Sequence, residues 1–380
     1  MSLRPTRLFL LVLSFGLAVS LSAKPRAREL GVPFDGKPGP LNAITDVAGI
    51  EVGQTTIIRG DGKLVVGEGP VRTGVTAIFP RGKKSDAAVF AGWFSLNGNG
   101  EMTGTTWIEE AGILEGPIAL TNTHSVGVVR DTIIQWQVAH RPPENKIWWS
   151  LPVVGETWDG WLNDINGFHV HPADVFAALD SATTGPVAEG AVGGGTGMVC
   201  HEFKGGIGTA SRVRGGYTIG VLVQANYGLR HQLLIAGVPV GREIPDGKIR
   251  PDEAGSILII IATDAPLLPH QLKRLARRAA LGLGRMGSAS GDGSGDLFLA
   301  FSTANTVPIE RHKAGDVKML VTDDLSPLFE ATVQATEEAI TNALVAGETM
   351  TGIDGHKVLG LPHDKLRAVL KKYGRLVEKP

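Results

Sequence analysis

The chain has 380 residues, of which 43% are hydrophobic and 20% charged, so it is long enough to bury one large core or two ordinary ones. Its formal net charge is −1, and its lysine and arginine residues are scattered rather than gathered in one stripe. This distribution argues against nucleic acid as a partner. Cys200 is the single cysteine of the sequence, so an intrachain disulfide is excluded.

The N-terminal segment, residues 1–23, has the pattern of a secretory signal peptide. Two arginines precede an apolar run over 8–21, and small residues follow it. The run is shorter than the roughly 20 apolar residues that span a bilayer. We therefore expect cleavage after Ser22 or Ala23, export to a bacterial periplasm, and no membrane attachment of the mature chain.

Past this segment, apolar runs alternate with helical patterns. Nearly continuous apolar runs predict buried strands over 75–79, 87–90, 118–121, 147–154, 217–224, 256–262 and 297–302. The spacing of apolar residues predicts helices over 129–140, 172–179 and 267–283, the last with a solvated basic face. Ser326 and Pro327 are expected to begin a long helix, as N-cap and first-turn proline, that ends at Gly347. Sheets covered by helices are the expected result, which gives an α/β or α+β fold.

The junction of Gly255 and Ser256, which opens a predicted strand, is a candidate site of self-cleavage. Glycine offers an unhindered carbonyl carbon and reaches backbone conformations that other residues avoid. The serine hydroxyl would attack that carbonyl and move the chain onto its own oxygen, and hydrolysis of the ester would leave two chains. The freed Ser256 would then combine a hydroxyl nucleophile with an α-amine base of pKa about 7.7 to 8.0. By itself, however, the dipeptide is more typical of a turn before a strand.

Other polar groups stand at the ends of predicted strands. Asn226 follows such a strand, where its amide would donate to a developing oxyanion, although asparagines at strand ends are also common in turns. Glu156 follows another apolar run, where a buried carboxylate would bind a substrate ammonium or form a structural salt bridge. Ser294 and Asp296 lie in a glycine-rich loop that lacks the lysine and spacing of a phosphate-binding loop.

Several motifs spread over nearly the whole mature chain occur in an order shared by a known family. They are Asn42-Ala-Ile-Thr-Asp46-Val-Ala-Gly49, Leu151-Pro-Val-Val-Gly-Glu156-Thr-Trp-Asp159-Gly160, Gly193-Gly-Gly-Thr-Gly197-Met198, Phe203-Lys-Gly-Gly-Ile-Gly-Thr209, Ser256-Ile-Leu-Ile-Ile-Ile-Ala-Thr-Asp264 and Gly293-Ser294-Gly-Asp296. With these motifs the sequence resembles the DmpA-type aminopeptidases, N-terminal-nucleophile hydrolases that comprise L-aminopeptidase D-esterase/amidases and β-peptidyl aminopeptidases.

The resemblance implies a fold and an organisation of the chain. The expected fold is a four-layer αββα sandwich. Residues 24–255 would form a large chain and 256–380 a small chain of the same structural domain after self-cleavage. The family commonly forms homotetramers, here of such two-chain units, and needs neither a cofactor nor a metal.

The resemblance also assigns roles to the candidate residues. Ser256 would be the nucleophile, Asn226 the oxyanion donor, and Ser294 with Asp296 would hydrogen-bond around the new amine and the nucleophile. Some members have glutamate where this chain has Asp296, which has one methylene less of reach. Glu156 would bind the substrate's ammonium. Trp158 stands where the aminopeptidase/D-amidase members have tyrosine, and because of this difference we expect β-amino-acyl substrates to be favoured.

Alternatives remain at this point. Within the family, an L-aminopeptidase or D-amino acid esterase/amidase would act on a small peptide or an amino acid amide with the same machinery. A metal-dependent amidohydrolase would use His169 and His171, and Cys200 beside His201 would suggest a metal site or a thiol nucleophile. A non-catalytic periplasmic binding protein would be isolated as one intact chain without turnover.

Overall fold

The computed structural model describes residues 24–141, 148–249, 255–307 and 314–378. The predicted signal peptide, 1–23, lies outside the described residues, and so do residues 250–254 immediately before Gly255. Within the described ranges, no helix is both long and apolar enough to cross a membrane.

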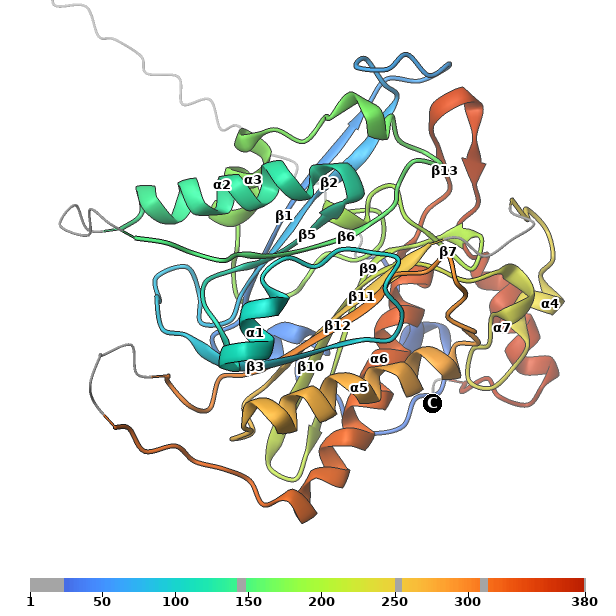
Figure 1. Cartoon of the computed structure of the whole chain (residues 1–380). Coiled ribbons are helices and arrows are strands. Elements are labelled where there is room, and N and C mark those ends of the chain that lie inside the picture. Colours follow the sequence, from blue (N-terminus) through green and yellow to red (C-terminus); the bar gives the residue numbers. More distant parts are fainter. Residues whose placement is uncertain (1–23, 142–147, 250–254, 308–313, 379–380) are drawn as a thin grey trace, which may run out of the picture.

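Two stacked β-sheets form the centre of the molecule (Figure 1). The four-stranded sheet has the order β1-β2-β5-β6 and the six-stranded sheet the order β4-β3-β12-β11-β10-β9. The first sheet consists of β1 (Glu51–Arg59), β2 (Val71–Phe79), β5 (Ile118–Asn122) and β6 (Val153–Thr157). The second consists of β4 (Ile113–Leu114), β3 (Val89–Ser95), β12 (Asp296–Ser302), β11 (Ser256–Thr263), β10 (Tyr217–Asn226) and β9 (Gly206–Arg214).

Helices cover the outer face of each sheet (Figure 1). The four-stranded sheet is covered by α2 (Val126–Ala139) and α3 (Pro172–Asp180), and the six-stranded sheet by α5 (Pro269–Arg285) and α6 (Ser326–Ala346). The remaining elements are α1 (Thr105–Ala111), α4 (Val240–Glu243), α7 (His363–Lys372) and two short hairpins, β7 (Val199–Cys200) with β8 (Phe203–Lys204) and β13 (Met350–Thr351) with β14 (Lys357–Val358).

The side chains of β11 show why the apolar run after Ser256 is continuous. Leu258 and Ile260 point into the core between the two sheets, whereas Ile257 and Ile259 belong to the core beneath α5 and α6. Successive side chains of a strand point to opposite faces, so a strand buried on both faces needs apolar residues at every position. A third core lies between the four-stranded sheet and its helices. The layers are therefore αββα, as expected from the sequence.

The strand expected over 147–154 is the clearest error of the sequence-based prediction. The strand observed there, β6, covers Val153–Thr157, residues 148–152 have no regular structure, and residue 147 lies outside the described residues. The apolar character before the strand comes from indole rings that pack in a loop, since Arg141 stacks on Trp148. Glu156 consequently lies within a strand rather than after it.

Three other elements differ from the sequence-based prediction. Strand β9, which was not expected, is rich in glycine because α6 crosses it closely: a Cβ atom at Gly208 would collide with the carbonyl oxygen of Ala339. Strand β1 was missed because its partly exposed residues form no apolar run. Ser326 is not the N-cap, since a 3-10 turn over Thr322–Leu325 precedes it and gives it helical backbone angles, whereas the expected end of this helix at Gly347 is confirmed.

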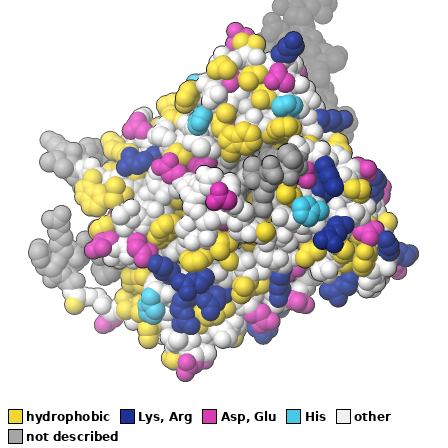
Figure 2. Space-filling view, turned by 45° about the vertical axis from the view of Figure 1, so that its right-hand side comes forward, with side chains coloured by type: hydrophobic (Ala, Val, Ile, Leu, Met, Phe, Trp, Pro, Cys, Tyr) yellow, Lys and Arg dark blue, Asp and Glu magenta, His cyan; other side chains and the backbone are white. Residues whose placement is uncertain are grey.

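The basic side of α5 is a solvated helix face, as expected. Figure 2 shows lysine and arginine side chains interspersed with acidic ones over the visible surface, with a local group in the lower part of the view. On α5, Lys273 pairs with Glu109, and Arg277 and Arg278 lie over the rings of Phe94 and Phe329. These cations are thus engaged with the protein's own side chains.

Candidate active site

Ser256 is the first residue of β11, at the edge of the core between the sheets. Its partner across the antiparallel pair with β10 is Asn226, so the two side chains lie next to each other on the same face of the sheet. The hydroxyl oxygen of Ser256 accepts a hydrogen bond from the backbone N–H of Gly295 at 3.1 Å. This donor would stabilise negative charge on the oxygen as it becomes a nucleophile.

Gly255 is a glycine for a steric reason. Its φ is +148°, and a Cβ atom at this position would collide with the carbonyl oxygen of Asn226. A side chain at this position would therefore push Ser256 away from its partner on β10. The residue before the nucleophile is thus fixed by the packing of the sheet, as its carbonyl must be if Ser256 is to attack it.

The glycine-rich loop before β12 holds the two other predicted catalytic residues beside β11. Ser294 donates a hydrogen bond through Oγ to Oδ1 of Asp296 at 2.7 Å, and the same oxygen accepts the N–H of Ile257 at 3.2 Å. Asn97 anchors this loop, because its Oδ1 accepts the N–H of Asp296 and its Nδ2 donates to the carbonyl of Ser290. Asp296, held by Ser294, therefore positions the backbone directly after the nucleophile.

The side-chain amide of Asn226 has a fixed orientation. Its Oδ1 accepts the N–H of Val199 at 2.7 Å, and its Nδ2 donates to the carbonyl oxygen of Trp158 at 2.8 Å. An amide nitrogen carries two hydrogens, and the bond to Trp158 uses one of them. The geometry therefore suits donation of the second hydrogen to an oxyanion formed at Ser256.

Glu156 is a buried carboxylate at the edge of the four-stranded sheet. Its oxygens accept hydrogen bonds from the N–H of Glu101 at 2.9 Å and from the hydroxyl of Thr123 at 2.5 Å. Burial raises the pKa of Glu156 above its ordinary value, and these two hydrogen bonds only partly oppose that effect. Among the described residues, no lysine or arginine pairs with it, so the structural salt bridge considered from the sequence is absent from this part of the chain.

One cavity of about 340 Å³ contains both Ser256 and Glu156, whereas Asn226, Ser294 and Asp296 are not among the residues that line it. Its lining includes Ser256, Glu156 and Thr123 and the partly exposed indole of Trp158. This volume suits a ligand of the size of one or two amino acid residues. The cavity therefore presents a nucleophile and an anion to the same small molecule.

The histidines considered for a metal site lie elsewhere and are otherwise engaged. His169 Nε2 contacts a carboxylate oxygen of Asp164 at 2.8 Å, and its Nδ1 contacts Arg59 at 2.7 Å, while His171 precedes α3 at the surface. Across the described ranges, no group of three or more His, Cys, Asp or Glu is arranged to hold a metal ion. Burial raises the pKa of the Cys200 thiol to about 12, which makes it a poor nucleophile. The geometry thus gives the alternatives based on these residues no support.

Thr123, Asn97 and the N–H of Gly295 belong to the site but were not identified from the sequence. A signal for Thr123 existed, since it follows a predicted strand at the end where a parallel neighbour would place Glu156. Asn97 acts through its side-chain amide and Gly295 through its backbone N–H, and both depend on the conformation of loops, which has no pattern in the sequence.

Known structures and sequences agree on the class of this protein. The solved structure of an L-aminopeptidase D-Ala-esterase/amidase from Ochrobactrum anthropi, described as a variant of the Ntn hydrolase fold, matches with a TM-score of 0.88 and 50% identity over 93% of this chain and all of that chain. A β-aminopeptidase from Burkholderia sp. matches with a TM-score of 0.85 and 50% identity over 94% of this chain and all of that one.

The sequence comparisons define the family. The pattern of peptidase family S58 matches residues 42–358, and the chain belongs to this family. It is 56% identical to "Beta-peptidyl aminopeptidase BapA" from Sphingosinicella microcystinivorans, over 95% of this chain and 96% of the relative. A protein of the same name from Sphingosinicella xenopeptidilytica is 52% identical over 95% of this chain and 94% of its own length. The resemblance stated from the sequence motifs is confirmed.

Proposed function

We propose that this chain is a self-processing serine aminopeptidase that releases N-terminal residues from small peptides, amino acid amides or esters. The observation that carries this proposal is the single cavity shared by Ser256 and Glu156. A carboxylate a short distance from the nucleophile selects substrates with a free ammonium group. Membership of peptidase family S58 supports the same activity.

Maturation would begin with Ser256 acting on its own chain. Its Oγ attacks the carbonyl carbon of Gly255, the bond from that carbon to the Ser256 nitrogen breaks, and an ester to Oγ replaces it. Water then hydrolyses the ester, which leaves a carboxylate on Gly255 and a free α-amine on Ser256. The chains 24–255 and 256–380 would remain together, because every residue of β11 pairs with a residue of β10.

In turnover, Glu156 would hold the ammonium of the substrate while Ser256 attacks its first carbonyl. The α-amine of Ser256 accepts the hydroxyl proton and later passes it to the leaving amine. Asn226 Nδ2 donates to the oxyanion, and Ser294 and Asp296 hold the new N-terminus in place. Water completes the reaction by hydrolysing the acyl-enzyme.

Substrates that begin with a β-amino acid are the proposed preference. The names of the two Sphingosinicella relatives support this choice, as does Trp158, which stands where the sequence resemblance places tyrosine in the aminopeptidase/D-amidase branch. The cavity volume alone suits both substrate classes. The competing proposal is an L-aminopeptidase or D-amino acid esterase/amidase with the same catalytic residues.

Export and assembly complete the proposal. The basic and apolar pattern of residues 1–23 supports secretion into a bacterial periplasm. Four copies of the two-chain unit would form the active particle, as the family resemblance implies. N-terminal sequencing of protein from a periplasmic extract, expected to start at Ala23 or Lys24, and light scattering of that protein test these two points.

The mass of the purified protein under denaturing conditions tests the central step. We expect two chains, the smaller beginning with Ser256, and one intact chain for Ser256→Ala. Ser256→Cys is the matched control, because its thiol remains a nucleophile and should still process. A fully active protein with no chain that starts at Ser256 would overturn the assignment, and loss of its activity on chelation would favour a metal enzyme instead.

A further inference from the structure

A buried lysine lies directly behind the oxyanion donor. Lys204 belongs to the β7–β8 hairpin, and its side chain is fully buried. Its Nζ donates to the carbonyl oxygen of Met198 at 2.7 Å and to that of Gly205 at 3.0 Å. Among the described residues no carboxylate forms an ion pair with it, so its partners are carbonyl groups of the main chain.

The Met198 carbonyl links Lys204 to Asn226 through one peptide group. The carbonyl of Met198 and the N–H of Val199 belong to the same planar amide, and that N–H donates to Oδ1 of Asn226 at 2.7 Å. A cation on the oxygen of an amide polarises it and makes its N–H a stronger donor. Lys204 and the catalytic amide therefore occupy opposite ends of one rigid, polarised unit.

This contact also decides which way the Asn226 amide points. The N–H of Val199 needs an acceptor, so it holds Oδ1 on the hairpin side and leaves Nδ2 on the side of Trp158 and the cavity. An amide turned by 180° would bring two donors together. The orientation required of an oxyanion donor thus depends on the position of the Met198–Val199 peptide.

Lys204 also has a structural role, because its ammonium donates to the buried main-chain carbonyl oxygens of Gly195, Met198 and Gly205. Burial of an ammonium group is costly. An apolar residue of similar length would fill the same space but would remove the side-chain donor of these carbonyl oxygens. Burial lowers the pKa of Lys204 to about 7, so the group is divided between ammonium and amine near neutral pH, and the polarisation of the amide is strongest below pH 7. A residue that is this expensive to bury is expected to contribute something besides packing.

We propose that Lys204 is a positioning residue of the catalytic machinery, which fixes and polarises the Asn226 amide through the Met198–Val199 peptide. The inference rests on the proposed function, because it needs Asn226 to be the oxyanion donor. Lys204 acts before and during the formation of the tetrahedral intermediate, without contact with the substrate.

The first test replaces Lys204 with methionine, which has a similar length and no charge. We expect kcat for a β-homoamino-acyl p-nitroanilide to fall about tenfold or more, with KM within about twofold of the parent value. Phe203→Leu is the matched control: it removes packing from the same hairpin, so its Tm should fall while kcat is retained. Equal kcat for Lys204→Met and the parent enzyme would overturn the proposal.

The second test asks whether the effect passes through Asn226. In an Asn226→Ala background, Lys204→Met should change kcat by less than about twofold, since the group that it positions is gone. Full additivity of the two losses would show that Lys204 acts by another route. If Asn226→Ala alone leaves kcat unchanged, the oxyanion assignment in the proposed function is itself wrong, and the inference falls with it.

A third variant covers poor folding of Lys204→Met. Lys204→Gln keeps a donor for the Met198 carbonyl but removes the charge. We expect it to fold and to show a loss of kcat between that of the parent enzyme and that of Lys204→Met. Parental kcat in a folded Lys204→Gln enzyme would show that the charge is not needed, contrary to the proposal.

Discussion

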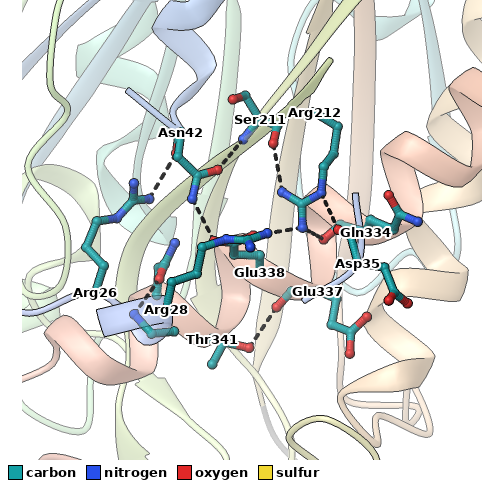
Figure 3. A network of polar contacts seen from close by, with 12 residues as sticks. Arg26, Arg28, Asp35, Asn42, Ser211, Arg212, Gln334, Glu337, Glu338 and Thr341 are labelled. Carbon is teal, nitrogen blue, oxygen red and sulfur yellow. Dashed lines mark hydrogen bonds and ion pairs between the residues drawn. The ribbon is translucent and has the colours of Figure 1, made fainter. Parts of the chain in front are cut away.

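Two glutamates of this protein are about equally buried but have opposite surroundings. Glu338 on α6 accepts a two-pronged contact from Arg28 at 2.7 and 2.8 Å, an ion pair from Arg212 at 2.7 Å and a hydrogen bond from Asn42 at 2.6 Å (Figure 3). Glu156 accepts a hydroxyl and a backbone N–H, with no lysine or arginine paired to it among the described residues.

The pKa values of the two carboxyl groups follow from this difference. Burial alone would raise the pKa of Glu338, but the hydrogen bond and charge of Arg28 and the charge of Arg212 outweigh burial and hold the pKa below its ordinary value. For Glu156 burial prevails and the pKa is raised. Glu338 is paired with cations inside the fold, whereas Glu156 lines a cavity, where we propose that it binds the ammonium group of the substrate.

Removal of the Glu338 charge is expected to have the largest effect, and it acts on stability. Glu338→Gln leaves the buried Arg212 and the partly exposed Arg28 without their carboxylate, and loss of one partner of a buried pair typically costs about 3–5 kcal/mol. Because Arg28 and Glu338 lie in the proposed large and small chains, the loss should also weaken their association. Denaturant unfolding measures the effect, with Glu330→Gln, which breaks an exposed pair with Arg214, as a control worth about 0–1 kcal/mol. Equal stability of the two variants would contradict the assignment of Glu338 to structure.

Removal of the Glu156 charge should act on turnover and spare the fold. Glu156→Gln keeps the shape of the side chain but loses the charge that would pair with the substrate ammonium. We therefore expect kcat/KM to fall roughly 30- to 1,000-fold, which corresponds to a loss of about 2–4 kcal/mol of transition-state stabilisation. Processing at Ser256 should continue, since no ammonium takes part in it. The parent enzyme should also strongly prefer a free amine over an N-formyl substrate, and Glu156→Gln should lose most of this preference. A processed variant that keeps the preference would show that another group binds the amine.

A fall in pH should affect Glu156 and Glu338 in opposite ways. The ordinary pKa of a glutamate is 4.5, and Glu156 becomes protonated at a pH above that value. As the pH falls through this range, kcat/KM of the parent enzyme should decrease. Glu156→Gln, which has no carboxylate to protonate, should lack this decrease. Folded Glu156 binds its proton more readily than the unfolded chain does, so this residue favours the folded state as the pH falls. Glu338 has the opposite sign: its stabilisation is present above about pH 4.5 and is lost as the pH falls through its lowered folded pKa. A Tm series from about pH 3 to 7 should therefore show weaker acid sensitivity for Glu338→Gln.

The contrast between these glutamates also shows which residue roles could be predicted from the sequence. Glu156 could be predicted as a site residue because a charge beside an apolar run is unusual and because it lies within a motif of the family. The role of Glu338 was not predicted, because it lies in a helix and its partners Arg28 and Arg212 are 310 and 126 positions away in the sequence. A residue whose role depends on its immediate neighbours in a motif was found, whereas a network assembled by folding was not.

The fold follows the same rule. The continuous apolar run of β11 and the spacing of α5 predicted their elements within a few residues, since burial of a strand or a helix face leaves a local pattern. Strand β9 lies where α6 approaches Gly208 closely, and Trp148, in the loop before β6, contacts Arg141 rather than continuing the strand. Such contacts join distant parts of the chain and leave no local period.

The smallest expected effect concerns Trp158, which lies beside Glu156 in the cavity. Its ring lies close to Gly160, where a Cβ atom would come within 2.6 Å of the indole. Trp158→Tyr removes part of this wall and replaces a donor at the indole nitrogen with a phenolic hydroxyl. A β-amino acid has one backbone methylene more than an α-amino acid, and one methylene in a pocket is worth about 1–3 kcal/mol. We therefore expect the ratio of kcat/KM for β-homoamino-acyl over L-alanyl p-nitroanilide to fall, by about tenfold at most.

The measurement has a matched reference in the same cavity. Thr123→Ser keeps the hydroxyl that donates to Glu156 and should leave the ratio within about twofold, because it changes neither the charge nor the wall formed by the indole. A parent enzyme that prefers the L-alanyl substrate by more than about tenfold, or about 1.4 kcal/mol, would overturn the β-amino-acyl preference itself. An unchanged ratio in Trp158→Tyr would instead place the discrimination elsewhere in the cavity, and leave Glu156 as the group that selects only the amine.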